Sequence, residues 1–380
     1  MLEQLKIENF RCFKYFEIGH LSKVNLIVGK NNGGKTTILE AIRLFNSQDI
    51  LSSLKEITTI RGESIGNQNK INITHVFNSH YVDLDKYLII SGINSNKDEY
   101  IKLSIDSADN IENTEMIRKL KQLILHEEEQ ESLNFKTEFK NTLKSVSAEQ
   151  GLINIPSIYD FSTEGEIIKK LDFFIGDMPL RLLIFNNSQI LKTKFISSSS
   201  LTPQESLKLF NQIVLTPEED LVYQALQIIE PNIERIAPIG NEIKNNNSRS
   251  GFFVRLKDTQ KRIPIGSMGD GIWRMLGLSL ALVSAKDGVL LVDEIDTGLH
   301  YTALEDMWKL IWETSKKLNV QVFATTHNSD CWKALEALTS RVDVGEEDIS
   351  IQRIEKDAPR SVAYNKEEIA TAVERETEVR

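Results

Sequence analysis

The feature that most constrains the fold of this sequence is a glycine-rich loop, GKNNGGKTT, which runs from Gly29 to Thr37. The apolar run VNLIV comes directly before the loop, and apolar residues recur at helical spacing after it, in ILEAIRLF. A buried strand, this loop and an amphipathic helix in that order are the setting of a P-loop, and a chance glycine turn before Lys-Thr would lack both flanks. The loop therefore predicts an α/β domain that binds nucleotide phosphates.

Each position of the loop has an expected role. Glycines allow several backbone N–H groups to point at one phosphate, and the N-terminus of the helix adds a partial positive charge. Lys35 is expected to reach the β- and γ-phosphates of ATP and to act in catalysis, and Thr36 is expected to ligate Mg²⁺. The other predicted phosphate-binding positions are Gly29, Asn31, Asn32, Gly33, Gly34 and Thr37.

A second motif, VLLVDE, occupies positions 289–294. An apolar strand that ends in two carboxylates is the Walker B arrangement, although by itself it is also compatible with a core strand that ends at an acidic turn. Asp293 is expected to hold Mg²⁺ through water, and Glu294 to polarise the water that attacks the γ-phosphate. The two motifs together predict an ATPase that converts ATP and water to ADP and phosphate, with ATP and Mg²⁺ as its cofactors.

Composition excludes several other classes of protein. The 380 residues are 41% hydrophobic and 26% charged, and they include no apolar run long enough to span a bilayer, so no membrane partner is expected. The start, MLEQLKIENFRCF, alternates polar and apolar residues and is not typical of a secretion signal. Two cysteines, Cys12 and Cys331, are too few for a disulfide framework and are expected to be inert core residues in the cytoplasm. A net charge of -10 weakens the case for nucleic-acid binding without removing it.

The pattern along the chain predicts a discontinuous domain. Residues 1–108 and 181–380 show the α/β rhythm, with strands expected at 289–292 and 320–324 and helices at 302–317 and after Ser329. Residues 109–180 differ, because apolar residues at helical spacing are followed by the acidic run HEEEQE and a long polar stretch. We therefore expect an ATPase head formed by 1–108 and 181–380, with a helical insertion at 109–180.

Four further segments resemble the ATPases that link SMC, RecF and OLD proteins to ABC transporter heads. ENFRCF at 8–13 looks like the start of these heads, and DTGLH at 296–300 looks like their D-loop. ATTHN at 324–328 is similar to the segment of their switch histidine, and IGSMGDG at 265–271 is similar to their signature sequence. The resemblance covers roughly 1–105 and 181–345, and it implies an ABC-type P-loop ATPase head.

The resemblance also assigns roles to residues outside the two motifs. His327 looks like the sensor of the γ-phosphate, although a lone histidine after a strand is more often structural. Ser267 and Gly269 would meet the γ-phosphate of an opposing subunit, so that hydrolysis requires a homodimer or a higher homo-oligomer with ATP between its heads. Taken alone, the segment SMGDG at 267–271 would be interpreted as a capped turn. His75 and His80 fall where such heads carry a Q-loop, but no glutamine pattern is present and their role stays open.

Within this group the chain looks closest to OLD-like ATPases and to the ATPase subunits of anti-phage defence systems such as Gabija and PARIS. OLD and Gabija ATPases continue into a Toprim nuclease domain, for which the residues after the switch segment are too few. We therefore expect a regulator or scaffold that dimerises on ATP and controls a separately encoded effector, with a Toprim-like nuclease as one candidate. The alternatives are a RecF-like DNA-repair ATPase that clamps DNA, and an ATP-bound switch without significant hydrolysis, which the carboxylate of Glu294 disfavours.

Overall fold

The structure is a computed structural model that describes residues 1–47, 49–63, 70–80, 87–95, 97–107, 152–154, 159–163, 166–175, 178–186, 191–238, 251–257, 261–339, 341, 343–355 and 357–375. The chain divides into two compact units, one made of Met1, Ile18–Leu39 and Leu191–Arg380, the other of Leu2–Glu17 and Glu40–Ile190. None of the described helices is both long and apolar enough to cross a membrane.

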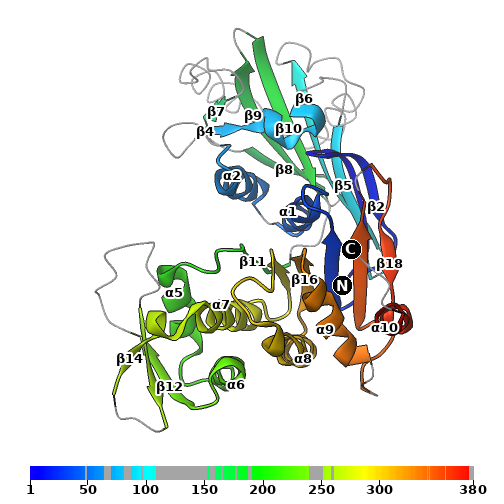
Figure 1. The fold of residues 1–380 in the computed structure, drawn as a ribbon. Coiled ribbons are helices and arrows are strands. Elements are labelled where there is room, and N and C mark those ends of the chain that lie inside the picture. The colour runs from blue at the N-terminus through cyan, green and yellow to red at the C-terminus, as the bar shows by residue number, and fades with distance from the viewer. Residues whose placement is uncertain are drawn as a thin grey trace. The chain divides into compact units, whose positions relative to one another are not determined.

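The first unit contains, in its described part, a six-stranded sheet with the order β11-β15-β16-β3-β17-β18 (Figure 1). The first five strands are parallel, and β18 joins β17 antiparallel. Because the parallel strands share one direction, the carboxyl ends of β11, β15, β16 and β3 meet at one edge of the sheet. The strands span Thr193–Ile196 (β11), Val289–Val292 (β15), Gln321–Thr326 (β16), Val24–Gly29 (β3), Ile349–Ile354 (β17) and Val362–Tyr364 (β18).

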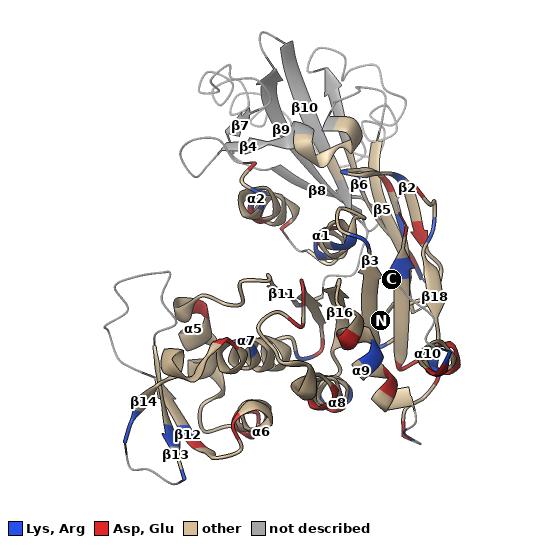
Figure 2. Cartoon of the chain, viewed as in Figure 1, with Lys and Arg blue, Asp and Glu red and all other residues tan. Residues whose placement is uncertain are grey.

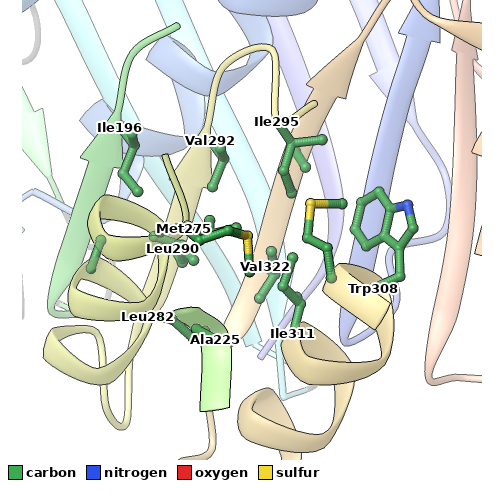
Figure 3. Packing of buried hydrophobic residues seen from close by; sticks show 14 of the residues in the cluster. Ile196, Ala225, Met275, Leu282, Leu290, Val292, Ile295, Trp308, Ile311 and Val322 are labelled. Atoms are coloured by element: carbon green, nitrogen blue, oxygen red, sulfur yellow. The ribbon is translucent and has the colours of Figure 1, made fainter. Parts of the chain in front are cut away.

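The central strands β3, β15 and β16 are buried along their whole length. This burial explains the apolar residues that dominate these strands, because the interior strands of a parallel sheet have both faces covered. Figure 3 shows the packing that covers them, with side chains of α7 (Asp270–Ser284) and α8 (Leu304–Lys317) against the sheet. Met275 and Leu282 come from α7, Trp308 and Ile311 from α8, and Leu290, Val292 and Val322 from the strands.

Further helices and a small sheet complete the first unit. Helix α5 begins with a capping box, in which Thr202 and Glu205 bond each other's backbone N–H, and Pro203 occupies its first turn. The three-stranded sheet β12-β13-β14 precedes a 3₁₀ turn, Ile265–Met268, and then α7. The remaining bounds are Pro203–Ile213 (α5), Glu219–Ile229 (α6), Ile233–Pro238 (β12), Phe252–Leu256 (β13), Ile263–Pro264 (β14), Ser329–Thr339 (α9) and Lys366–Glu374 (α10).

The second unit contains, among the described residues, a seven-stranded sheet with the order β2-β1-β5-β6-β10-β9-β8. The pairs from β1 to β8 are antiparallel. Helix α1 (Lys35–Phe45) begins in the first unit and ends in the second, where α2 (Ile50–Ile60) follows it. The strands span Leu2–Phe10 (β1), Phe13–Ile18 (β2), Tyr87–Asn94 (β5), Lys97–Ser107 (β6), Tyr159–Thr163 (β8), Glu166–Ile175 (β9) and Met178–Asn186 (β10). Strands β4 (Lys70–Asn72) and β7 (Leu152–Asn154) form a separate two-stranded sheet.

The ENFRCF segment holds a buried ion-pair cluster in the second unit. Arg11 is buried in a left-handed conformation (φ 50°), and its Nε lies 2.7 Å from Oε2 of Glu40 on α1. Its Nη1 lies 2.8 Å from Glu63 Oε1, and Arg61 Nε lies 2.6 Å from the other oxygen of Glu40. Burial raises the pKa of Glu40, whereas the two arginines act in the opposite direction. The cluster ties the segment between β1 and β2 to α1.

Most predicted elements are confirmed, and two expectations are not met. The strand at 289–292 matches β15 residue for residue, and the strand expected at 320–324 and the helices expected at 302–317 and after Ser329 are present as β16, α8 and α9. The helical insertion expected at 109–180 lies largely outside the described residues, but its described part forms β7, β8, β9 and the first residues of β10. Cys331 is buried as expected, whereas Cys12 is exposed, because it lies in the turn between β1 and β2.

Candidate functional site

The glycine-rich loop connects β3 to α1 in the first unit, as predicted. Lys35 is the first residue of α1, and its Nζ donates to the backbone carbonyls of Gly29 and Lys30, at 2.7 and 2.9 Å. Gly29 cannot be replaced without strain, because a Cβ atom there would lie 2.5 Å from the carbonyl oxygen of Ile354. Burial lowers the pKa of Lys35, and the carboxylates of Asp293 and Glu294 oppose that shift. The ammonium therefore lies within the electrostatic influence of the Walker B carboxylates.

Asp293, Thr36 and Thr325 converge at the carboxyl edge of the sheet. The Oγ1 atom of Thr36 lies 3.2 Å from both carboxylate oxygens of Asp293. From the adjacent strand β16, Thr325 Oγ1 donates to Asp293 Oδ1 at 2.6 Å. The structure thus brings together the two residues predicted to hold Mg²⁺. Their hydroxyl and carboxylate oxygens are the hard ligands that Mg²⁺ prefers, and such sites commonly take only one or two ligands from the protein.

Glu294 has a strained backbone and a histidine neighbour. Its φ of 47° lies in the left-handed region, which is uncommon for a residue with a side chain. Its backbone N–H donates to Thr325 Oγ1 at 2.9 Å, and one carboxylate oxygen lies 3.5 Å from Nδ1 of His327. Both side chains remain accessible, with 40% of Glu294 and 52% of His327 exposed. The predicted base and the predicted sensor are therefore adjacent and open to solvent.

Ser267 and Gly269 lie directly before the first residue of α7. Ser267 lies within the 3₁₀ turn Ile265–Met268, and the N-cap position of α7 is Gly269 (φ 92°). The serine hydroxyl therefore does not cap this helix, because glycine occupies that position. Both residues are exposed, and a Cβ atom on Gly269 would meet no other atom within 4 Å. The start of α7 offers backbone N–H groups and the positive end of a helix dipole to an anion.

The D-loop segment contacts the start of this same helix. A Cβ atom on Gly298, whose φ is 78°, would lie 3.2 Å from Cβ of Asp270. A Cβ atom on Gly271 would in turn lie 3.3 Å from the carbonyl oxygen of Gly298. Two glycines thus allow the segment after Glu294 to pack closely against the first residues of α7.

Sequence reasoning missed three residues at this edge. Thr325 and Thr326 orient the acidic residues, since Thr326 Oγ1 donates to Asp296 Oδ1 at 2.6 Å. Arg274 is buried in α7, where its guanidinium reaches the backbone of the Walker B turn. Two signals were available in the sequence, namely the threonine pair before His327 and the lone basic residue in an apolar helix. His75 and His80 belong to the second unit, and the backbone carbonyl of His75 accepts a bond from Arg11 at 3.5 Å.

The chain is similar to several known proteins. An "ATP/GTP phosphatase" of Helicobacter pylori is 22% identical over 351 residues, which cover 90% of each chain. The "DNA replication and repair protein RecF" of Ligilactobacillus salivarius is 32% identical over 71 residues, which are 16% of this chain and 19% of that protein. The SMC head domain from Thermotoga maritima aligns over 96% of this chain and 98% of its own, with 12% identity and a TM-score of 0.43.

The family assignment rests on a model that spans most of the chain. The model of the AAA ATPase domain matches residues 1–331, which include the glycine-rich loop, the VLLVDE segment and His327. The match agrees with the parallel sheet and with the convergence of Thr36 on Asp293. The chain belongs to the AAA ATPase domain family and is a P-loop ATPase.

Proposed function

We propose that Lys35, Thr36, Asp293, Glu294 and His327 form the ATP-hydrolysing site of this ATPase. The observation that carries the proposal is the 3.2 Å separation between Thr36 Oγ1 and the carboxylate of Asp293. The two residues lie 257 positions apart in the sequence. Thr36 is the second residue of α1, which follows β3 and the glycine-rich loop, and Asp293 directly follows β15 of the same sheet. All five residues belong to the same compact unit.

Thr36 and Asp293 would hold Mg²⁺ at this site, because both present oxygen atoms at one point of the sheet edge. When bound, the ion would neutralise negative charge on the β- and γ-phosphates. Lys35 would give the phosphates the hydrogen bonds that it now gives to Gly29 and Lys30, since an ammonium has three donors that can exchange acceptors. The backbone N–H groups from Gly29 to Thr37 would complete the phosphate cradle.

Glu294 would act as the general base of the reaction. Its carboxylate is half-exposed, so a water molecule can approach it, and the fixed backbone limits where that water can bind. The base would accept a proton from the water as the water oxygen bonds to the γ-phosphorus, and the bond from that phosphorus to the bridging oxygen would break, so that ADP leaves. His327, 3.5 Å from Glu294, would contact the γ-phosphate and report its presence.

Two copies of the chain would bind one ATP between a P-loop and the start of an opposing α7. Support comes from the exposure of Ser267 and Gly269 and from the backbone donors at this helix N-terminus. A γ-phosphate contacted by the second copy would make hydrolysis dependent on a homodimer. A higher homo-oligomer built from such dimers is compatible with the same contact.

At the biological level, we propose that the chain regulates a separately encoded effector in anti-phage defence in the cytoplasm. The support is the resemblance of IGSMGDG and DEIDTGLH to OLD-like ATPases. The test is phage plating on cells that express the chain together with the protein of its neighbouring gene. We expect protection from phage only when both proteins are present. We also expect the change Lys35→Ala to abolish this protection. Equal plating with and without the pair would contradict the proposal.

A RecF-like ATPase that clamps DNA is the second candidate, which the similarity to RecF over 71 residues favours. The discriminating measurement is the ATPase rate of the purified chain with linear or gapped DNA added alone. A rate that rises several-fold on DNA, with no other protein present, would favour this candidate. A rate independent of DNA would favour the effector-regulating function.

A further inference from the structure

Arg274 is a buried cation in an otherwise apolar helix. Only 2% of its surface is exposed, and it shares α7 with one other charged residue, Asp270, in the sequence DGIWRMLGLSLALVS. Figure 2 accordingly shows α7 as largely uncharged. Burial lowers the pKa of Arg274 to about 10, which leaves the side chain protonated at neutral pH. Burying a charge is costly unless hydrogen bonds compensate it, so the partners of this guanidinium indicate why it is there.

The guanidinium of Arg274 binds backbone carbonyls of two segments at the carboxyl edge of the sheet. Its Nη2 atom donates to the carbonyls of Asp293 and Glu294 at 2.9 and 2.7 Å, and its Nη1 atom donates to Ser197 at 2.7 Å. The Nε atom lies 3.5 Å from the carbonyl of Ile295. Ser197 directly follows β11, and the other carbonyls belong to the turn after β15. Arg274 thus links α7 to the ends of two adjacent strands.

The turn that Arg274 binds is the strained one. Glu294 has a φ of 47°, a conformation that costs free energy and persists only where surrounding contacts enforce it. On one side, the backbone N–H of Glu294 donates a hydrogen bond to the hydroxyl of Thr325, at 2.9 Å. The backbone N–H of Ile295 donates to the backbone carbonyl of Thr325, at 3.0 Å. On the other side, Arg274 binds the carbonyls of Asp293 and Glu294. Both peptide groups that flank Glu294 are therefore fixed, and they set the direction of its carboxylate.

The start of α7 lies close to the guanidinium along the same helix. Arg274 follows Asp270 by four residues, which corresponds to about 6 Å along the axis. A helix is stiff over this distance, so a displacement of its N-terminus would move the guanidinium as well. The D-loop glycine Gly298 packs against Asp270, which connects the same turn to the helix a second time.

We propose that Arg274 is a positioning residue for ATP hydrolysis. It holds Glu294 in the left-handed conformation through backbone carbonyls, and it thereby makes turnover, but not nucleotide binding, depend on the position of α7. The inference rests on the proposed role of Glu294 as the base. It predicts two measurable properties of Arg274 variants. Turnover should fall while nucleotide affinity does not, and the planar, multidentate guanidinium should be required, so that another positive charge cannot replace it.

The first test compares Arg274→Met and Arg274→Lys with the matched control Ser279→Ala. Ser279 is buried in the same helix, and its hydroxyl donates to the helical carbonyl of Leu276 at 3.0 Å. The affinity for a non-hydrolysable ATP analogue, the single-turnover rate and the melting temperature are measured for each protein. We expect the rate to fall about 100-fold in both Arg274 variants, because a misplacement of about 1 Å at a reacting group costs that much. The analogue affinity should stay within about threefold of wild type.

The second test is chemical rescue of Arg274→Ala by added guanidinium at millimolar concentration. Guanidinium should restore part of the turnover rate, whereas urea, which is neutral and of similar shape, should not. Turnover of Arg274→Lys within about threefold of wild type would overturn the proposal, since a point charge would then suffice. A parallel loss of affinity and turnover without rescue would also overturn it. A wild-type protein without turnover would instead contradict the proposed function itself.

Discussion

At the scale of single residues, the site depends on polar side chains that orient one another. The carboxylate of Asp293 contacts Thr36 and Thr325, and the backbone of Glu294 is bound by Thr325 and Arg274. Hydrogen bonds to a charged group are stronger than those between neutral groups, so these contacts fix the acidic residues well. Changes at Lys35, Glu294 and Arg274 therefore test the roles assigned to single side chains.

Removing the ammonium of Lys35 should weaken nucleotide binding. Charge-assisted hydrogen bonds contribute about 1.5–3 kcal/mol, so Lys35→Ala should lower the ATP affinity roughly 10- to 150-fold. Isothermal titration calorimetry with ATP measures this directly. The matched control is Lys30→Ala, which removes an exposed lysine from the same loop and should change the affinity less than threefold. Equal affinities of the Lys35→Ala and wild-type proteins would exclude Lys35 from the phosphate site.

Neutralising Glu294 should act on turnover alone. General-base catalysis contributes about 10²- to 10⁴-fold, so Glu294→Gln should lower kcat by that factor while ATP still binds. Phosphate release under saturating ATP measures kcat. The control Glu305→Gln changes an exposed acidic residue at the start of α8 and should leave kcat unchanged. If Glu294→Gln turned over ATP like the wild type, another group would have to be the base.

The residues of the two motifs could be predicted from the sequence because their spacing is itself the signal. Lys35, Thr36 and Asp293 lie where the strand, loop and helix pattern places them. Arg274 and Thr325 could not be assigned in this way. The partners of Arg274 are backbone carbonyls, and Thr325 contacts Asp293 only because β15 and β16 are adjacent in the sheet. Adjacency of strands that are distant in sequence becomes visible only in the fold.

At the scale of elements, the secondary structure of a continuous apolar segment could be predicted, whereas that of a segment with mixed polar and apolar residues could not. The sequence VLLV can only be a buried segment, and its length of four residues favours a strand. The segment EIIKKLDFFI, which forms β9, has neither a clean period of two nor a clean helical period. Its strand conformation depends on pairing with β8 and β10, which the local sequence does not encode.

The contact between the D-loop and α7 gives a prediction for Gly298. The change Gly298→Ala places a Cβ atom 3.2 Å from Asp270 Cβ, in a residue whose φ is 78°. Left-handed backbone costs an L-residue roughly 1–2 kcal/mol, so the free energy of unfolding in urea should fall by about that amount. Turnover should fall further than ATP affinity, because the altered segment connects Glu294 to α7.

The control for this change is Gly345→Ala. A Cβ atom there would meet only Asp348, at 3.6 Å, which is ordinary van der Waals contact. Its unfolding free energy should stay within about 0.5 kcal/mol of wild type. Equal unfolding curves for the two variants would show that Gly298 tolerates a side chain and that its contact with α7 is loose.

At the scale of the whole molecule, the α/β class and the P-loop ATPase fold follow from the order of the motifs. The expected domain boundaries at 108 and 181 are a different division from the two compact units, since residues 2–17 and 87–107 group with the segment up to 190. The discontinuous head with an insertion at 109–180 therefore stays a proposal about domains. A sequence pattern marks where the periodicity changes, whereas compact units reflect which strands pair with one another.

The central claim is that two chains close on ATP through the start of α7, and the mass of the Glu294→Gln protein in solution tests it most directly. This variant should bind ATP without turnover, and light scattering should give the mass of two chains with ATP and of one chain without it. Adding Ser267→Arg to this variant should keep the protein at the mass of one chain while ATP still binds.

The matched control adds Gln212→Arg, which introduces the same charge at an exposed position of α5. Gln212 belongs to the last turn of α5, and α5 is a different element from the segment before α7 that holds Ser267 and Gly269. We predict two chains with ATP for the control and one chain for the Ser267→Arg protein. A Glu294→Gln protein that binds ATP as a single chain, or a Ser267→Arg protein that pairs as readily as the control, would contradict the account.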